Sequence, residues 1–123
     1  MRALIVDDSK TMRLILGRLL LQAGFETCEA GDGREALGRL AQTGALDLAL
    51  VDWNMPVMNG LELIQEIRAR SEFADMKVMM VTTEAEMARV VQALSAGADE
   101  YMMKPFTAEA LGDKLCLLGL GPQ

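Results

Sequence analysis

The sequence predicts an α/β fold: an open, doubly wound sheet of five parallel strands flanked by five helices. Short apolar runs of strand length alternate with longer segments that carry apolar residues at helical spacing. Gly24 and Gly97 follow two of the helical segments, as is typical of helix ends. Neither an internal repeat nor a long linker interrupts the alternation, which favours a continuous series of strand–helix units.

Each element is expected from its own pattern. The expected strands cover residues 3–7, 25–30, 46–52, 77–82 and 100–104, and the expected helices cover about 9–23, 32–43, 60–70, 84–96 and 107–118. The first helix carries five apolar residues on one stripe, Met12, Ile15, Leu16, Leu19 and Leu20. Asp32 and Thr107 have the residue types of helix caps, and the polar segment 25–30 suits an edge strand. We expect one domain over residues 1–123, with a core over about 2–118 and a tail over 119–123.

Composition limits the classes of function. The hydrophobic fraction of 51% and the charged fraction of 24% are those of an ordinary soluble domain. The net charge of −6 opposes binding to nucleic acid or acidic membranes. The start of the chain, which reaches Asp7 and Asp8 after six residues, is too short and too acidic for a secretory signal. The expected location is therefore cytoplasmic.

Two residue types narrow the chemistry further. Histidine is absent, which excludes imidazole metal sites, Ser-His and Cys-His pairs and a phosphohistidine carrier. Cys28 and Cys116 have neither a CxxC spacing nor the density of a disulfide scaffold, so we expect both to be small buried hydrophobes. Metal binding by oxygen ligands and nucleophilic attack by a carboxylate remain.

Four of the expected strands end in polar side chains that apolar packing does not explain. Asp7 and Asp8 follow the first strand, Asp52 ends the third, Thr82 ends the fourth and Lys104 ends the fifth. Each of them alone fits a structural role, such as a solvated turn or an exposed lysine. Because parallel strands point the same way, these side chains gather at one edge of the sheet, where ligands of open α/β sheets bind. Their combination predicts a shared pocket.

The chemistry of such a pocket follows from its charges. Two unit charges roughly 4 Å apart repel by about 4 kcal/mol at an effective dielectric constant of about 20. A hard cation removes this conflict, and Mg²⁺ suits a site with few protein ligands, waters and a phosphate. A carboxylate can attack phosphorus to form an aspartyl phosphate. The transfer then requires that the negative charge on the phosphoryl oxygens be neutralised. Each of three groups can interact with one oxygen: Mg²⁺, the Lys104 ammonium, and the Thr82 hydroxyl together with a backbone N–H.

Four motifs surround these residues. They are LIVDDS at 4–9, LVDWNMPVMNG at 50–60, VTTE at 81–84 and YMMKPF at 101–106. In combination they resemble the receiver domains of bacterial two-component response regulators, above all the stand-alone chemotaxis (CheY-like) type. The resemblance covers essentially the whole chain. It implies a flavodoxin-like fold with strand order 2-1-3-4-5.

The resemblance also implies roles in the pocket. Asp52 would be the phosphoacceptor. Asp8 and Asp52 would bind Mg²⁺ directly, the backbone carbonyl of Asn54 would be a third ligand, and Asp7 would act mainly through water. Asn54 and Glu84 occupy the two variable positions that tune loss of the phosphoryl group in this family.

Lys104 would contact the phosphoryl group, and its peptide bond to Pro105 is expected to be cis. Thr82 and Tyr101 match the switch pair of the family: the phosphoryl group draws the hydroxyl of Thr82 inward, and Tyr101 rotates into the space vacated. Thr83 is a departure, because the chemotaxis type usually has a small residue there.

The implied function is that of a single-domain response regulator, which is not a turnover enzyme. It would take a phosphoryl group from a histidine kinase onto Asp52 and lose it by hydrolysis. In between, the surface of the fourth helix, fifth strand and fifth helix would be reshaped for a protein partner. The flagellar motor switch is one candidate partner, beside a kinase or a polarity or development protein. We expect a monomer, with dimerisation on activation left open, and neither nucleic acid nor a membrane as a partner.

Two alternatives stay open. One is a pseudo-receiver, an interaction module that never carries phosphate; retention of Asp8, Asp52, Thr82 and Lys104 counts against it. The other is a phosphatase with an aspartyl-phosphate intermediate. It would usually need an acid–base carboxylate two residues after the nucleophile, where this chain has Asn54, and a cap domain over the substrate.

Overall fold

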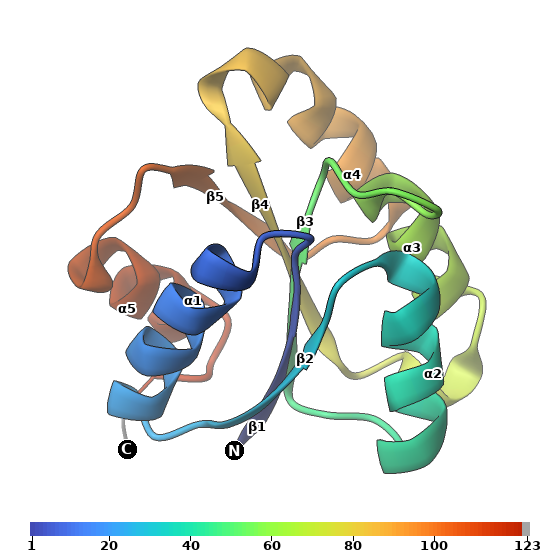
Figure 1. Cartoon of the computed structure of the whole chain (residues 1–123), viewed down its shortest axis with the longest axis horizontal. Helices are drawn as coiled ribbons and strands as arrows, with labels where there is room; N and C mark the ends of the chain where they lie inside the picture. Colours follow the sequence, from blue (N-terminus) through green and yellow to red (C-terminus); the bar gives the residue numbers. More distant parts are fainter. Residues whose placement is uncertain (122–123) are drawn as a thin grey trace.

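A parallel sheet of five strands, in the order β2-β1-β3-β4-β5, forms the centre of the computed structural model (Figure 1). The structure describes residues 1–121, without the side chains of residues 84, 85 and 87. The strands are β1 (Arg2–Val6), β2 (Glu26–Ala30), β3 (Leu48–Asp52), β4 (Lys77–Thr83) and β5 (Glu100–Lys104). The helices are α1 (Lys10–Gln22), α2 (Gly33–Thr43), α3 (Gly60–Arg68), α4 (Val90–Ala96) and α5 (Ala108–Leu117), with 3-10 turns η1 (Ser71–Phe73) and η2 (Glu84–Arg89). The predicted fold and strand order are confirmed.

The helices cover both faces of the sheet. α1 and α5 lie on one face, and α2, α3 and α4 lie on the other (Figure 1). Because successive side chains of a strand point to opposite faces, Leu4 and Val6 of β1 join the core under α2 and α3, while Ala3 and Ile5 join the core under α1 and α5. A strand covered on both sides reads as an unbroken apolar run, as the sequence predicts. β2 lies at the edge of the sheet and pairs with β1, in agreement with its polar composition.

Capping side chains determine where four helices begin. Asp32 accepts a hydrogen bond from the N–H of Glu35, and Thr107 accepts one from Ala110. Ser9 caps α1 in the same way, and Asn59 caps α3. Each of these side chains satisfies an N–H group that the first helical turn leaves without a partner. The predicted caps Asp32 and Thr107 are confirmed.

The helix predicted over 84–96 is wrong in its first half. Residues 84–89 form η2, and α-helical geometry begins only at Val90. Val90 and Ala93 are buried, whereas Arg89 is exposed. The helix therefore starts where an apolar face meets the core. At the start of η2, the hydroxyl of Thr83, the last residue of β4, donates to a carboxylate oxygen of Glu86 (2.9 Å), a local bond that competes with helical pairing.

Leu120, which lies beyond α5, stays in contact with the domain. Leu120 packs against the core under α1 and α5, and its N–H donates to the carbonyl of Leu115 (2.8 Å). In the described part of the predicted tail, residues 119–121, Leu120 is therefore anchored to the domain. Cys116 is exposed, contrary to our expectation, because it lies one position beyond the buried Leu115 on the helix surface. Among the described residues, the helices lack the length and apolar character needed to span a membrane.

Candidate functional site

Polar side chains from four strands meet at the carboxyl edge of the sheet. Asp7 directly follows β1, and Asp52 is the last residue of β3, its neighbour in the sheet. Thr82 is the second-to-last residue of β4, and Lys104 is the last residue of β5. After β1 the chain turns to one face of the sheet, and after β3 it turns to the other. This is the position at which open α/β sheets bind ligands, and the predicted convergence is confirmed for Asp7, Asp8, Asp52 and Lys104.

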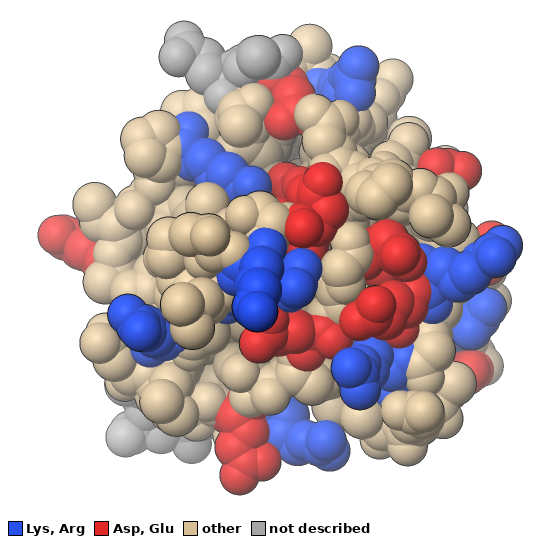
Figure 2. All heavy atoms as spheres, in the orientation of Figure 1, with Lys and Arg blue, Asp and Glu red and all other residues tan. Residues whose placement is uncertain are grey.

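Most of these polar groups are buried. Asp7 and Thr82 are 1% exposed and Asp52 is 7% exposed, although the core around them is apolar. Asp8, by contrast, is exposed. Figure 2 shows acidic side chains gathered in the middle of one face of the molecule, with basic side chains among and around them. Burying carboxylates costs free energy unless they are paired or bind a cation, so the buried Asp7 and Asp52 need positive charge nearby.

Lys104 supplies part of that charge. Its Nζ lies 3.2 Å from Oδ1 of Asp52 and 3.2 Å from Oδ2 of Asp7. Burial alone would lower the pKa of Lys104, but the two carboxylates outweigh it and raise that pKa above its usual value. Burial and the adjacent Asp7 raise the pKa of Asp52 to about 6, against the opposing effect of Lys104. One ammonium therefore does not fully neutralise the cluster.

The carboxylates form a set of oxygen ligands suited to one metal ion. Asp7, Asp8 and Asp52 each place a carboxylate oxygen within 4.8 Å of those of the other two. Oxygen donors in this number suit a hard divalent cation, and Mg²⁺ commonly binds through one or two carboxylates with water completing its shell. Both oxygens of Asp7 are already engaged, Oδ1 by the N–H of Ser9 and Oδ2 by Lys104.

The loop after β3 is built tightly around Asp52. The N–H of Gly60 donates to the carbonyl of Trp53 (2.9 Å), and a Cβ at Gly60 would collide with the carbonyl oxygen of Asp52. Asn59 and Glu62 form a capping box that fixes the start of α3. The lack of a side chain at Gly60 is therefore what lets α3 begin directly behind Asp52.

The other predicted residues lie around this centre. Thr82 is buried, and its hydroxyl donates over 3.4 Å to the carbonyl of Thr83. Tyr101 is half-buried against the core that lies under α2 and α3 and extends to α4. Asn54 is exposed in the loop after β3. The Lys104–Pro105 peptide bond is cis, as the resemblance implies. The side chain of Glu84 lies outside the described residues.

Sequence reasoning missed two contacts beside the site. The Arg13 guanidinium donates to the carbonyl of Asp7 (2.7 Å) and to Glu29 (2.9 Å). Arg89 lies over the ring of Trp53, with its Cζ 5.3 Å from the ring centroid, so Trp53 is covered by a cation as well as by the core. The partners Glu29 of Arg13 and Trp53 of Arg89 are distant in the chain, and no local spacing in the sequence indicates such pairs.

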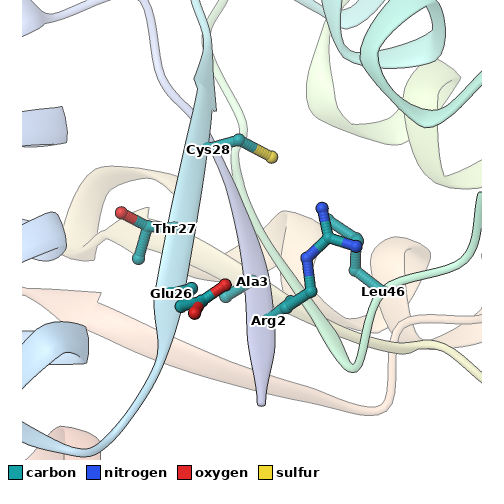
Figure 3. A pocket seen from close by; sticks show the side chains of 6 residues that line it. All are labelled: Arg2, Ala3, Glu26, Thr27, Cys28 and Leu46. Carbon is teal, nitrogen blue, oxygen red and sulfur yellow. The ribbon is translucent and has the colours of Figure 1, made fainter. Parts of the chain in front are cut away.

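A cavity lies at the opposite end of the sheet, near the starts of β1 and β2. It has a volume of about 70 Å³ and is lined by Arg2, Ala3, Glu26, Thr27, Cys28 and Leu46. Figure 3 shows the side chains of Cys28 and Arg2 extending to one side of β2 and that of Thr27 to the other. Burial raises the pKa of the Cys28 thiol despite the nearby arginines, so this thiol is a weak nucleophile. The cavity is separate from the carboxylate cluster.

Comparisons with known proteins agree with this fold. The family model of the response regulator receiver domain matches residues 3–115. The chain is 45% identical to a chemotaxis protein CheY homolog of Campylobacter jejuni, over 98% of this chain and 95% of that protein. It is 46% identical to chemotaxis protein CheY-3 of Vibrio cholerae, over 94% of this chain and 88% of that protein. A solved structure of chemotaxis protein CheY4 of Vibrio cholerae superposes with a TM-score of 0.87 at 34% identity, covering 95% of this chain and 97% of that one.

The chain therefore belongs to the response regulator receiver domain family, the phosphorylation-dependent signalling modules of two-component systems. Within that family it is a CheY-like response regulator, similar over nearly its whole length to the chemotaxis proteins named above. These relatives are response regulators, a class distinct from turnover enzymes.

Proposed function

We propose that residues 1–123 act as one receiver domain that accepts a phosphoryl group on Asp52 from a histidine kinase, with Mg²⁺ as cofactor. The observation that supports this most directly is the position of the Lys104 ammonium, 3.2 Å from Asp52 in a pocket that also holds Asp7 and Asp8. A nucleophilic carboxylate, a cation partner and further oxygen ligands thus share one edge of the sheet.

Three groups would hold the metal: the carboxylates of Asp8 and Asp52 and the backbone carbonyl of Asn54, with Asp7 acting through water. When bound, Mg²⁺ supplies positive charge to one oxygen of the transferred phosphoryl group. Lys104 contributes its ammonium to a second oxygen. The buried hydroxyl of Thr82 has only a long bond to Thr83 and can turn to a third.

In the transfer step, an oxygen of the Asp52 carboxylate attacks phosphorus while the bond from phosphorus to the donor's histidine nitrogen breaks. The electron pair stays on the departing imidazole, which takes a proton from water. The signal ends by hydrolysis of the aspartyl phosphate. A water molecule attacks phosphorus, the bond to Asp52 breaks, and inorganic phosphate leaves with the carboxylate restored. Asn54 and Glu84, which flank the pocket in sequence, are the residues we assign to tuning this hydrolysis. Each cycle ends in loss of the signal, so the chain acts as a switch and not as a turnover enzyme.

Phosphorylation would be read out on the surface formed by α4, β5 and α5. Rotation of the Thr82 hydroxyl toward the phosphoryl group leaves space near β5, where Tyr101 is half-buried. The same surface exposes large apolar side chains: Val91 is 69% exposed, and Leu94 and Met103 are 41% exposed. Exposed apolar groups on adjacent elements are suited to a protein partner.

The chemotaxis relatives favour a partner in the chemotaxis machinery, and the flagellar motor switch is the partner we propose. We further propose a cytoplasmic monomer, and light scattering before and after phosphorylation would test whether activation causes it to dimerise. The net charge of −6 disfavours nucleic acid and acidic membranes as partners.

The test is incubation of the purified protein with Mg²⁺ and a small acyl phosphate, followed by intact mass. Wild type should gain the mass of one phosphoryl group, and chelator should prevent the gain. Asp52→Asn should gain none, while an exposed control, Asp113→Asn, should gain as much as wild type. The absence of any modification would support a pseudo-receiver, and steady phosphate release from unrelated esters would support a phosphatase. A pull-down that compares protein with and without a bound phosphoryl mimic would then identify the partner.

A further inference from the structure

Arg13 of α1 connects the acidic pair after β1 to the edge strand β2. Its Nη1 donates to the backbone carbonyl of Asp7 (2.7 Å), and its Nε donates to Oε1 of Glu29 (2.9 Å). The Arg13 side chain is 18% exposed and the Glu29 side chain is 51% exposed. The guanidinium is thus held by Glu29 from the outer side while it binds the main chain on the inner side.

This contact completes the restraint of the Asp7 main chain. The N–H of Asp7 donates to the carbonyl of Ala30 in β2 (3.1 Å), and the carbonyl of Asp7 accepts from Arg13. The carbonyl of Asp7 and the N–H of Asp8 belong to the same planar peptide unit. Binding the oxygen therefore fixes the orientation of the unit that leads into Asp8.

Such a restraint is useful because the carboxylates of the pocket repel one another. Asp7 and Asp52 are buried and share Lys104, but Asp8 is exposed. Its side chain can move away from the other two at little cost, which would open the ligand set of three oxygens within 4.8 Å.

We propose that Arg13 is a positioning residue for the metal site, which holds the Asp7–Asp8 peptide unit so that the Asp8 carboxylate faces Asp52. The proposal rests on the metal-binding role of Asp8 and Asp52 set out above. Glu29 orients the guanidinium, in the way that outer residues of metal sites orient the ligands.

The direction in which Mg²⁺ affinity changes on loss of Arg13 distinguishes a positioning role from a purely electrostatic one. Arg13 carries a positive charge close to a site for a dication. If this charge were its only effect, Arg13 would weaken Mg²⁺ binding, and removing the charge would strengthen that binding. A positioning role has the opposite effect: loss of the contact weakens Mg²⁺ binding despite the loss of the repelling charge. Arg13→Lys keeps the charge but loses the paired N–H geometry, so it isolates positioning from charge.

The experiment is isothermal titration calorimetry of Mg²⁺ into wild type, Arg13→Lys, Arg13→Ala and Arg18→Ala at fixed ionic strength. Arg18 is an exposed arginine of the same helix and serves as the charge-matched control. We expect Arg13→Lys and Arg13→Ala to raise the Kd about threefold or more, with Arg18→Ala equal to wild type or slightly tighter. Faster hydrogen exchange at the N–H of Ser9, which binds the Asp7 carboxylate, should accompany the weaker binding.

An Arg13→Lys affinity equal to that of wild type, or tighter binding by Arg13→Ala, would overturn the proposal. If Arg13→Ala fails to fold, as judged by circular dichroism, the conservative lysine variant still decides the question. A wild type that binds no Mg²⁺ would refute the proposed cofactor and is a separate outcome from these.

Discussion

The Nζ of Lys104 lies 3.2 Å from Oδ1 of Asp52, and the same nitrogen lies 3.2 Å from Oδ2 of Asp7. One ammonium is thus shared by two buried carboxylates that come from different strands. Because the three residues are far apart in the chain, this arrangement exists only when β1, β3 and β5 are correctly placed. The charge balance of the resting pocket depends on Lys104.

Lys104→Met should destabilise the metal-free protein. The substitution leaves two buried carboxylates without their cation, and we expect the free energy of unfolding to fall by about 1–2 kcal/mol. This is less than the about 3–5 kcal/mol of a fully buried pair, since the Lys104 side chain keeps some contact with water. Urea denaturation in chelator measures the change.

Added Mg²⁺ should recover much of this loss, because a bound dication neutralises the same carboxylates. Lys10→Met, at an exposed position of α1, is the control and should leave stability within about 0.5 kcal/mol of wild type. Equal stability of the Lys104→Met variant and wild type in chelator would show that the shared ammonium contributes nothing.

Asp52→Asn should raise the melting temperature of the metal-free protein in mildly alkaline buffer and have little effect in acid. Folding raises the pKa of Asp52 from 3.8 to about 6, chiefly through burial. A group with a raised pKa stabilises the fold while it is protonated, below its unfolded pKa, and this contribution is lost as the pH rises through its folded pKa. Asparagine stays neutral throughout, so the gain should grow between about pH 4 and pH 7.

Thermal melts of the two proteins across that pH range, in chelator, give the comparison. Asp113→Asn, on the exposed side of α5, is the control for removal of one negative charge. A gain from Asp52→Asn that is largest in acid would contradict the raised pKa.

The alternation of apolar runs and helical stripes was sufficient to predict where the strands lie, because burial on both faces leaves a clear pattern. The strand order was implied by the resemblance to receiver domains and not by this pattern. The pattern predicted less well which apolar residues are buried and where a helix begins, because both depend on packing against other elements. Ile15 belongs to the predicted apolar stripe of α1, yet it is 44% exposed, because the stripe is wider than the contact with the sheet. Residues 84–89 have a helical pattern but form a 3-10 segment, held by Thr83 and Glu86.

The site likewise contains residues that could be predicted from the sequence and residues that could not. Asp7, Asp52, Thr82 and Lys104 could be placed together from the sequence, because parallel strands bring their ends to one edge. Arg13 could not be placed, since it lies on α1 while its partner Glu29 lies on β2, and the contact depends on how α1 packs against that strand.

Gly60→Ala should destabilise the protein by about 2 kcal/mol or more, because the new Cβ would collide with the main chain at Asp52. Gly38→Ala is the matched control, in the middle of α2 where a Cβ meets no atom within 4 Å. Alanine favours helices there, so the control should gain up to about 1 kcal/mol. Urea denaturation distinguishes the two, and equal effects would refute the close approach at Asp52.

Arg89→Ala should change the environment of Trp53, the only tryptophan. Loss of the cation over the ring exposes the indole to water, and its emission should shift to longer wavelength. The free energy of unfolding should fall by about 0.5–1 kcal/mol. Arg18→Ala, remote from the ring, should leave the spectrum unchanged. An unaltered spectrum for Arg89→Ala would show that the contact does not persist in solution.

The most direct test of the account is to locate the phosphorylated residue. After reaction with an acyl phosphate and Mg²⁺, borohydride reduces an aspartyl phosphate to homoserine, which peptide mass spectrometry can assign to one position. The account predicts homoserine at position 52 alone, and none in chelator. Homoserine at position 7 or 8, or metal-independent labelling, would contradict it.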